Sequence, residues 1–588
     1  MLSWLKKYQT AIFLGIFCFA FFGIYAHFNL MVINPEGVGD NPKFPSPDET
    51  ANYFWVKQFA TGQPLYYFEG LNLPGNGLIH PRSVNVVDGK NVPGSFLGLI
   101  LIYGGLAKIF GLGVIPYLAP LFAALGIFFF YLLLKKIFES TPVALISAIL
   151  LAFTPAWFYY VCRGMYHNVP FVSLLIAGLY FLWKALLDKN NGNFQTTNPK
   201  SKIPKSIISH QKYNSLSVAS YKLLVNYFFS GLLLGLSILT RTSEFAWVAL
   251  TVLLILIINF KKIYWPGFVM FVAAGIISLV ILFYYNQILY GSFLSAGYRA
   301  VGEAIEKGGL ASASILFQIL ITPFGVDVRS IFINGSNYLY RLFPIWGSLG
   351  FLGAFLFVIL PTHWIKISYP KRIIYFIYCL LIAAYLLVFY GSWAITDRID
   401  KGTLSLGTSY LRYWLPIYIV ALPFIATIIW QLSNFLTPLK KRKVLYQSFF
   451  SFFVIGFIFL PTMNVLLRQS DESLFLLKNL NEARTKSGIV NKLVNSDDII
   501  LIYKQADKIF FPERQKIITE LAVPIDYESV ARLAKLRPLY YYTFAKPADV
   551  ASISRRYFQP YGLEIINGQR VLGTDWLYQV QLTVNNKQ

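Results

Sequence analysis

Long apolar runs constrain this chain more than any other feature of its sequence. The first, residues 10–33, is almost wholly apolar, and a helix needs about 20 such residues to cross a bilayer. Hydrophobic residues make up 56% of the chain and charged residues 13%, against about 25% charged residues in soluble domains. Because hydrocarbon offers backbone N–H and C=O groups no partner, runs of this length fold as helices. The sequence therefore predicts a polytopic α-helical membrane protein.

Basic residues between the runs predict the side of the membrane on which each loop lies, because cytoplasmic loops carry an excess of Lys and Arg. Lys6 and Lys7 place the N-terminus in the cytoplasm. No small-residue cleavage site follows the first run, so we expect an uncleaved signal anchor. If successive spans then cross the membrane in alternating directions, the sequence predicts about eleven transmembrane helices. The expected spans are residues 10–33, 115–134, 143–160, 169–187, 223–239, 245–259, 263–288, 343–360, 373–390, 413–429 and 444–467.

This topology explains the formal net charge of +24 without a nucleic-acid partner, because the basic residues cluster in the inner loops. We expect residues 94–110 to be a re-entrant or interfacial segment, and residues 188–221 to be a cytoplasmic linker. The protein is predicted to lie in the cell membrane, plasma or inner, in contact with its lipids.

Two stretches outside the spans are long enough to fold by themselves. The first outer loop, residues 34–93, contains a half-apolar segment at 51–67 that we expect to be a short interfacial helix. The apolar runs stop after about residue 469, and residues 498–503, 538–544 and 576–583 are typical of strands. Helices are expected at 527–536 and 547–558. The sequence therefore predicts a transmembrane domain at 1–468 and a small extracytoplasmic α/β domain at 469–588.

The first outer loop holds the strongest candidates for chemistry. Asp48 and Glu49 stand at the start of the expected interfacial helix, where an acidic residue either caps the helix or acts as a catalytic base on a hydroxyl group. His80, Arg82 and Lys90 follow in the same loop. Basic side chains there either hold a phosphate or reach toward the interface as snorkelling cations. Together these residues suit a substrate that has both a hydroxyl and a phosphate.

Three arginines lie at the outer ends of expected spans, which runs against the inside bias of basic residues. They are Arg163, Arg241 and Arg412. Their position favours phosphate or carboxylate binding over snorkelling.

Five short motifs follow one another in the order expected of one known family. They are Asp48-Glu49 with Tyr53 and Ala60-Thr61-Gly62; Gly89-Lys90 with Pro93; the hairpin from Gly231 to Arg241; Tyr290-Gly291-Ser292 with Gly297-Tyr298; and Arg412-Tyr413-Trp414-Leu415-Pro416. This order resembles the C superfamily of glycosyltransferases (GT-C), in the branch that uses polyprenyl-phosphate sugars. That branch includes the protein O-mannosyltransferases and the aminoarabinose transferase of lipid A. The resemblance covers about residues 1–430.

The resemblance implies roles for individual residues. Asp48 is expected to be the base that activates the acceptor, and Lys90 to sit near the lipid phosphate, with Tyr298 in the large outer loop. Members often carry a second acidic residue before the fourth span, where this chain has His167 and Asn168. Either His167 or Glu49 takes that part, or the part is dispensable.

No metal site is predicted, because one acidic pair is a poor cage for a hard dication. We therefore expect no required cofactor, and a divalent cation stays open only as an addition. The three cysteines, Cys18, Cys162 and Cys379, are far apart in the sequence and indicate neither a metal site nor a disulfide framework.

The function expected from the sequence is an inverting glycosyltransferase. It would move a sugar from a polyprenyl-phosphate donor to an acceptor hydroxyl of a protein, lipid or glycan on the outer face of the membrane. The alternatives are a secondary transporter or flippase of a lipid-linked substrate, and a lipid scaffold. Transporters place charges within their spans and often show two related halves, whereas this chain carries its charges in outer loops and shows no obvious repeat. These features favour the enzyme.

Overall fold

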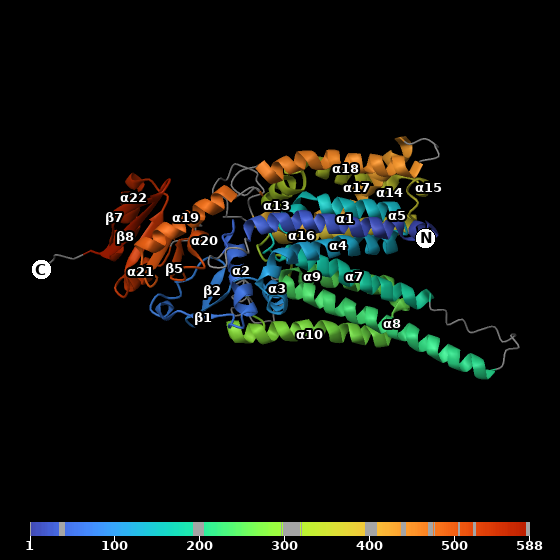
Figure 1. Ribbon diagram of the computed structural model, residues 1–588, viewed down its shortest axis with the longest axis horizontal. Helices are drawn as coiled ribbons and strands as arrows, with labels where there is room; N and C mark the ends of the chain where they lie inside the picture. The colour runs from blue at the N-terminus through green and yellow to red at the C-terminus, as the bar shows by residue number, and fades with distance from the viewer. Residues whose placement is uncertain are drawn as a thin grey trace.

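A helical bundle and an α/β unit lie end to end in the protein, with the first outer loop between them (Figure 1). The computed structural model describes residues 2–33, 42–191, 205–295, 297, 318, 320–393, 409–436, 443–468, 474, 477–503, 506–520 and 525–583. The N-terminus lies at the end of the bundle that is farthest from the α/β unit (Figure 1).

The bundle contains most of the helices of the chain. They are α1 (Leu2–Val32), α4 (Ile115–Phe138), α5 (Thr141–Phe153), α6 (Pro155–Val161), α7 (Asn168–Asn191), α8 (Lys205–Thr240), α9 (Phe245–Ile258), α10 (Trp265–Tyr290), α13 (Val328–Ser336), α14 (Pro344–Ile359), α15 (Thr362–Ile365), α16 (Tyr369–Gly391), α17 (Leu415–Leu436) and α18 (Lys443–Arg468). Short helical turns join them: η2 (Leu112–Val114), η3 (Thr242–Glu244), η4 (Phe260–Lys262), η5 (Asn337–Arg341) and η6 (Ser409–Trp414).

Seven of these helices are long and apolar enough to cross a membrane, and the number rises to nine if each of two bent pairs is one span. The bent pairs are α5 with α6, at 55°, and the α13–η5 segment with α14, at 98°. The remaining two predicted spans fall on α9 and α18, whose apolar stretches are shorter. The described residues are thus consistent with a polytopic membrane protein, while the count of eleven stays a prediction.

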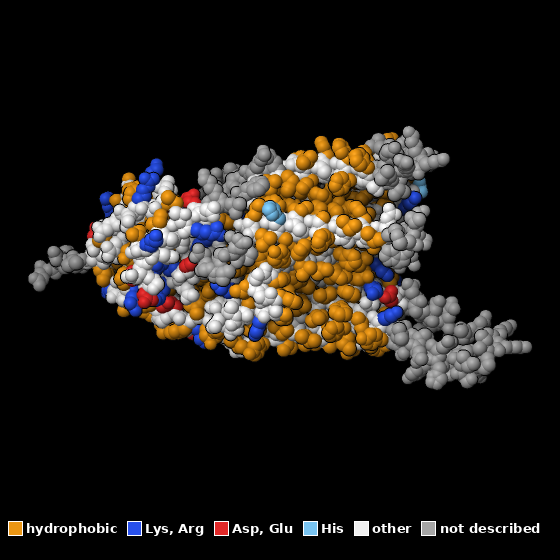
Figure 2. Space-filling view, in the orientation of Figure 1, with side chains coloured by type: hydrophobic (Ala, Val, Ile, Leu, Met, Phe, Trp, Pro, Cys, Tyr) orange, Lys and Arg blue, Asp and Glu red, His pale blue; other side chains and the backbone are white. Residues whose placement is uncertain are grey.

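An apolar surface covers the bundle, as expected of helices in contact with lipid (Figure 2). Phe19 is 77% exposed, and Val280 and Phe355 are also exposed. Charged side chains gather instead on the α/β unit and at the two ends of the bundle (Figure 2). Between the helices, aromatic side chains such as Trp157 and Trp414 are fully buried. The bundle therefore has an apolar core and an apolar outer face.

The first outer loop folds into two helices and a small sheet. These elements are α2 (Pro47–Ala60), β1 (Tyr67–Phe68), η1 (Gly70–Asn72), β2 (Val84–Val87), β3 (Lys90–Pro93) and α3 (Leu97–Phe110), with antiparallel strand order β1-β3-β2. The interfacial helix expected at 51–67 begins four residues earlier and ends seven residues earlier. Its start is fixed by the Ser46 cap and Pro47 at the first helical position, and its end by the turn at Gly62, where φ is +76°.

The C-terminal α/β unit is built on one five-stranded sheet of order β5-β4-β6-β8-β7, in which β4 is parallel to β5 and β6 and the other pairs are antiparallel. Its elements are α19 (Leu477–Leu493), β4 (Ile499–Tyr503), α20 (Asp507–Phe510), β5 (Ile517–Glu520), α21 (Tyr527–Ala534), β6 (Leu539–Thr543), α22 (Pro547–Ile553), η8 (Ser554–Phe558), η9 (Gln559–Tyr561), β7 (Leu563–Leu572) and β8 (Asp575–Leu582). The strands expected at 498–503, 538–544 and 576–583 correspond to β4, β6 and β8. The division of the chain into two domains stays a prediction.

The sidedness of the bundle can be tested by cysteine labelling. We expect a single cysteine introduced at Ser206, within the predicted cytoplasmic linker, to stay unlabelled by an impermeant maleimide in intact cells, because the basic loops place it inside. The three native cysteines are buried and give a low background. Labelling of the Ser206 variant without permeabilisation would contradict the predicted topology. A cysteine at Asp549, in the C-terminal unit, should label under the same conditions.

Candidate active site

Helix α2 presents the acidic pair from its first turn. Ser46 caps the helix by accepting a hydrogen bond from the Asp48 backbone N–H at 3.3 Å, so both acidic residues lie at the positive end of the helix dipole. The two side chains then leave in different directions and meet different partners. Their roles therefore separate in the structure although they are adjacent in the sequence.

Asp48 is held by an arginine from a distant part of the chain and by a serine of its own loop. Arg412 Nη2 donates to Oδ2 at 2.8 Å, and Ser83 Oγ donates to Oδ1 at 2.5 Å. The side chain of Asp48 is still 24% exposed. Burial raises the pKa of this carboxyl, but the charge of Arg412, the bond from Ser83 and the nearby Arg82 outweigh it, so the pKa lies below the ordinary value of 3.8. Asp48 is thus an ionised and partly accessible carboxylate.

Glu49 is closed off in a buried ion pair. Arg163 Nε donates to both carboxylate oxygens at 3.0 Å, and Nη2 donates to Oε2 as well. The two side chains are 3% and 1% exposed, for Arg163 and Glu49 respectively. Arg163 also donates to the Tyr159 hydroxyl at 2.5 Å. This pair fixes α2 against the segment that follows α6, which is a structural role, and leaves Glu49 no open face toward a substrate.

Asn52, which the sequence analysis did not single out, links α2 to His167. Asn52 Nδ2 donates to the Met165 carbonyl at 2.8 Å and lies 3.2 Å from His167 Nε2, while Ser95 Oγ donates to Asn52 Oδ1 at 2.7 Å. Because the amide nitrogen is the donor, Nε2 accepts and the imidazole proton is on Nδ1. Asn52 is four residues after Asp48, and this helical spacing was the available signal for it.

His167 is a neutral imidazole in this network. Burial and the charges of Arg412 and Arg241 lower its pKa to about 3, so it is a poor substitute for a missing carboxylate base at neutral pH. Its neighbour Asn168 donates from Nδ2 to the Arg412 carbonyl at 3.1 Å. Asn168 therefore holds the segment that delivers Arg412 to Asp48, while His167 contacts Asn52 of α2.

A second arginine lies beside the first, and both guanidinium groups are 5.1 Å from the centre of the Tyr413 ring. Arg241 Nε and Nη2 donate to Glu244 at 3.1 and 2.6 Å, and Nη2 also donates to the Tyr390 hydroxyl at 3.0 Å. Within the described part of the chain, the Nη1 group of Arg241 donates to no acceptor. Asp48, Arg412, Tyr413 and Arg241 thus form one continuous series of contacts.

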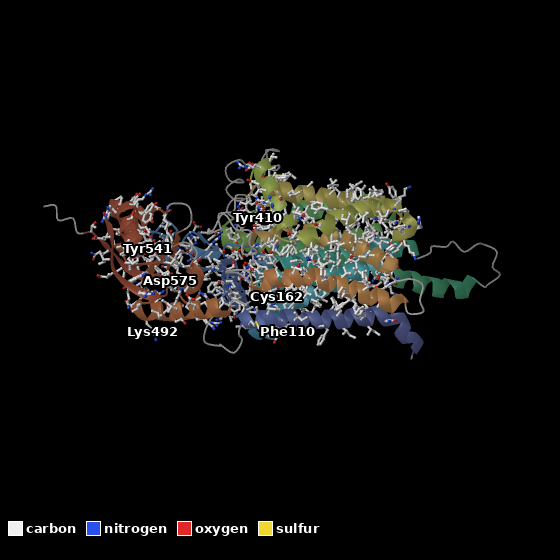
Figure 3. The ribbon with its side chains drawn as sticks, turned by 90° about the horizontal axis from the view of Figure 1, so that it is seen from above. Phe110, Cys162, Tyr410, Lys492, Tyr541 and Asp575 are labelled. Carbon is white, nitrogen blue, oxygen red and sulfur yellow. The ribbon has the colours of Figure 1, made fainter. Side chains whose placement is uncertain are left out.

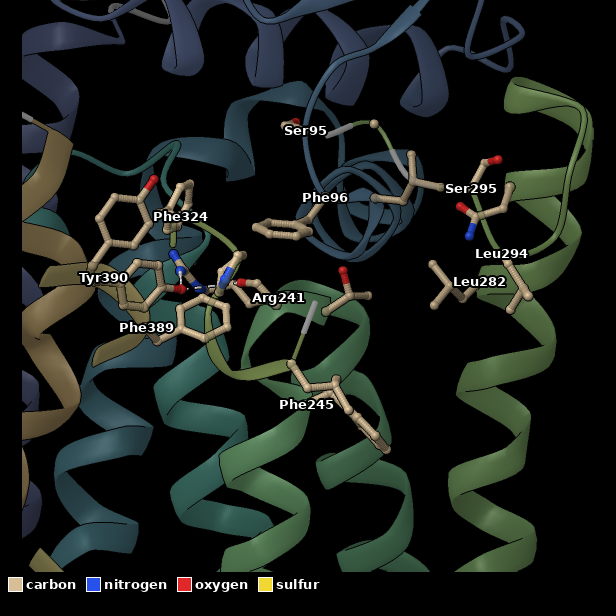
Figure 4. Close-up of a pocket in the computed structure, with 18 of the residues that line it drawn as sticks. Ser95, Phe96, Arg241, Phe245, Leu282, Leu294, Ser295, Phe324, Phe389 and Tyr390 are labelled. Atoms are coloured by element: carbon tan, nitrogen blue, oxygen red, sulfur yellow. Dashed lines mark hydrogen bonds between the residues drawn. The ribbon is translucent and has the colours of Figure 1, made fainter. Parts of the chain in front are cut away.

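A cavity of about 390 Å³ opens next to Arg241 (Figure 4). Arg241 and Phe96 lie between Tyr390 and Phe389 on one side and Leu282, Leu294 and Ser295 on the other (Figure 4). The remaining wall is mainly apolar and comes from α9, α10, α16 and the segment around Phe324; it includes Phe245, Leu282, Phe283, Phe293, Leu294, Leu320, Phe324, Phe389 and Trp393. Phe245 is 47% exposed and Phe293 is 53% exposed on the surface of the bundle. The cavity is therefore mainly apolar, with the Arg241 guanidinium in its wall and exposed phenylalanines at its rim.

The basic residues predicted in the first outer loop do not line the cavity. Lys90 Nζ is 5.0 Å from the centre of the Tyr66 ring, and Lys90 does not line the cavity. His80 Nδ1 donates to the neighbouring Pro81 carbonyl at 2.9 Å. Arg82 affects Asp48 through its charge, while its backbone N–H binds the C-terminal unit. Tyr298 lies outside the described residues.

Phe110, Cys162 and Tyr410 mark the end of the bundle where these elements meet, and Tyr541 and Asp575 lie in the α/β unit beyond it (Figure 3). The candidate site therefore stands at the junction of the bundle, the first outer loop and the C-terminal unit. Among the residues described, no group of three or more His, Cys, Asp or Glu side chains is arranged to hold a metal ion.

Part of the chain is similar to a known protein family. The model of the dolichyl-phosphate-mannose-protein mannosyltransferase family matches residues 101–197, from α3 to the end of α7, which includes Arg163, His167 and Asn168. Asp48 and Arg412 lie outside the matched part. A search of curated proteins found no match. The family match supports the GT-C superfamily of membrane glycosyltransferases.

Proposed function

Because the chain is similar to GT-C glycosyltransferases over residues 101–197, we propose that it transfers a sugar from a polyprenyl-phosphate donor to an acceptor hydroxyl, with Asp48 as the general base. The observation that carries this proposal is the series of contacts from Asp48 through Arg412 and Tyr413 to Arg241 in the wall of the apolar cavity. It brings an ionised carboxylate close to a space that suits a lipid phosphate.

The cavity fits the donor in shape and in polarity. Its volume of about 390 Å³ falls in the range of about 300–1,000 Å³ that is usual for ligand pockets. The apolar wall suits isoprenoid units, and because Phe245 and Phe293 of that wall are exposed, the rest of the tail could remain among membrane lipids. Arg241 in the wall offers Nη1 to the phosphate, and charge-assisted bonds of this kind are the strong ones.

The transfer step needs one base and a few cations. Asp48 accepts the proton of the acceptor hydroxyl as its oxygen attacks the anomeric carbon of the sugar, on the face opposite the phosphate. The bond from the anomeric carbon to the phosphate oxygen breaks, and the polyprenyl phosphate leaves with the bonding electrons and needs no proton. The stereochemistry at the anomeric carbon is inverted. Arg412 keeps Asp48 ionised before the step, and Arg241 compensates the charge on the leaving phosphate.

The proposal also includes the side of the membrane on which the reaction takes place and the donor sugar to test first. By the predicted topology the site lies on the outer face of the cell membrane, where both the donor and an acceptor protein, lipid or glycan have access. The description of the matched family makes mannose the first donor sugar to test. Incubation of the purified protein with polyprenyl-phosphate mannose and membrane extracts from a strain lacking the protein should give mannosylated products. The absence of transfer from mannose and from every other polyprenyl-phosphate sugar offered would contradict the proposal.

Filling the cavity should weaken donor use. Leu282→Trp puts an indole into a cavity wall on α10, and overpacking of this kind costs about 1–3 kcal/mol. We expect the donor KM to rise by about tenfold to a hundredfold on that scale, with the acceptor KM unchanged. Val280→Trp is the matched control, because Val280 is on the opposite face of the same helix and is 59% exposed. Equal donor KM values in the two variants would remove the donor tail from this cavity.

A further inference from the structure

The C-terminal α/β unit does not stand apart from the candidate site, because it shares its core with the first outer loop. Ile79 is fully buried among Ile499, Leu501 and Ile518 of the sheet. His80 forms a parallel bridge with Ile518, so the loop extends the sheet at the free edge of β5.

Helix α20 contacts the loop on both sides of the base. Lys508 Nζ donates to the Pro45 carbonyl at 2.7 Å, and Asp507 Oδ2 accepts the Arg82 backbone N–H at 2.8 Å. Pro45 stands immediately before the cap of α2, and Arg82 immediately before Ser83. Two neighbouring residues of the C-terminal unit thus hold the two loop segments that supply the Asp48–Ser83 hydrogen bond, whose partners are 35 residues apart in the chain.

The backbone at Ser83 needs such support. Its φ is +64°, a left-handed conformation that costs a residue with a side chain free energy and persists only when its surroundings impose it. The Arg82 N–H is bound by Asp507 on one side, and the Ser83 carbonyl accepts from the Gly94 N–H at 3.1 Å on the other. These two anchors aim Ser83 Oγ at Asp48.

Asp507 itself has no contact with the cavity or with Asp48. It is 1% exposed, and its Oδ1 atom has no partner among the described residues. A buried carboxylate is costly, and the Oδ2 atom of Asp507 accepts the backbone N–H of Arg82, the residue next to Ser83. A carboxylate in this position is well placed to fix a peptide rather than to bind a substrate.

We propose that Asp507 and Lys508 are positioning residues for the base. Through them, the C-terminal unit holds Asp48 and Ser83 within hydrogen-bond distance of each other. The expected loss of kcat rests on the proposed function, whereas the expected change in the loop structure does not. We call the two contacts, Lys508 with Pro45 and Asp507 with Arg82, the clamp. Without it, Ser83 can leave its strained conformation, and Asp48 loses the hydrogen-bond partner that orients it toward the acceptor. The donor cavity, which α20 does not touch, is unaffected.

The kinetic test compares three variants. Asp507→Ala should lower kcat by about tenfold to a hundredfold, the scale expected for a misplaced catalytic group, with the donor KM unchanged. Asp507→Asn keeps an oxygen that accepts the Arg82 N–H and should restore kcat to within about threefold of the wild type, since a neutral acceptor preserves the bond. Asp497→Asn is the matched control, because Asp497 is in the same unit, pairs with Lys516 and is 66% exposed. Equal kcat values for Asp507→Ala and the control would overturn the proposal.

The structural test does not depend on activity. Hydrogen exchange of the protein in nanodiscs should quicken at residues 79–84 in Asp507→Ala, but not in Asp507→Asn or in the control. Lys508→Met should quicken exchange at residues 42–48, and it keeps the test available if Asp507→Ala does not fold. Unchanged exchange in these segments would overturn the clamp. If the wild type transfers no sugar but the variants show these exchange changes, the proposed function is refuted, whereas the positioning role of Asp507 and Lys508 stands.

Discussion

Replacing Asp48 by Asn is expected to abolish sugar transfer while the protein still folds and inserts. The amide has nearly the shape of the carboxylate but cannot take a proton, and general-base catalysis contributes about 10²–10⁴ in rate. Its Oδ1 atom can still accept from Ser83. The measurement is kcat of the purified variant, with expression and thermal unfolding followed in parallel.

The matched control is Asp88→Asn, because Asp88 is an exposed acidic residue of the same loop, in the turn between β2 and β3. This variant should behave as the wild type. Residual activity of Asp48→Asn within about tenfold, which corresponds to only about 1.4 kcal/mol of barrier, would remove Asp48 from the role of base.

Arg412→Gln should move the acidic limb of the pH profile to higher pH. Burial raises the pKa of Asp48, and the charge of Arg412 is the largest opposing effect, followed by the bond from Ser83 and the charge of Arg82. A base with a lowered pKa acts at every pH above that pKa and loses activity only as the pH falls through it. Removing a neighbouring opposite charge changes a carboxyl pKa by about 1–3 units, so the limb of the variant should rise by that amount.

The limb is measured as kcat against pH between about pH 2.5 and 9, a range that extends below ordinary carboxyl titration and above imidazole titration. Tyr166 and His167 also lie near Asp48. Burial raises the pKa of Tyr166, and burial with the charges of Arg412 and Arg241 lowers the pKa of His167 to about 3, so neither group titrates near neutral pH. Arg412→Lys keeps the positive charge and serves as the control, with a limb close to that of the wild type. Superimposable acidic limbs for Arg412→Gln and the wild type would show that Arg412 does not set the ionisation of Asp48.

The sequence predicted Asp48 as the base because its position and residue type agreed. An acidic residue after the first span, at the start of a helix in a long loop, is a local pattern. The same pattern did not separate Asp48 from Glu49, because their difference depends on partners 364 and 114 residues away, Arg412 and Arg163. Only tertiary packing decides which carboxylate is tied into a buried pair and which stays partly exposed.

The choice between Lys90 and Arg241 as the phosphate-binding residue also depends on tertiary packing. Lys90 was the first candidate for the phosphate because it is in the same loop as Asp48, whereas the structure places Arg241 in the wall of the cavity and Lys90 over Tyr66. The sequence had singled out Arg241 by its position at the outer end of a predicted span. Its proximity to Asp48 follows from the packing of η6 and α8 on the first loop, which a single sequence does not encode locally.

Some strands of the C-terminal unit could be predicted from the sequence. Strands β4, β6 and β8 have the apolar and aromatic residues that pack in a sheet. Strand β5 spans only four residues, and β7 contains a polar centre at Asn567 and Gly568 with a register shift beside it, so neither gave a clear pattern. The core that Ile79 shares with the C-terminal sheet could not be predicted from the sequence, because it joins residues more than 400 positions apart.

The most direct test of the central claim follows the fate of the donor lipid. Purified protein in liposomes containing polyprenyl-phosphate mannose, with an acceptor extract outside, should release one polyprenyl phosphate for each sugar transferred, and this release should be lost in Asp48→Asn. The same experiment separates the enzyme from a flippase, because a flippase moves the lipid-linked sugar across the bilayer without breaking its bond. Donor that crosses the bilayer intact, at the same rate in the wild type and in Asp48→Asn, would contradict the account.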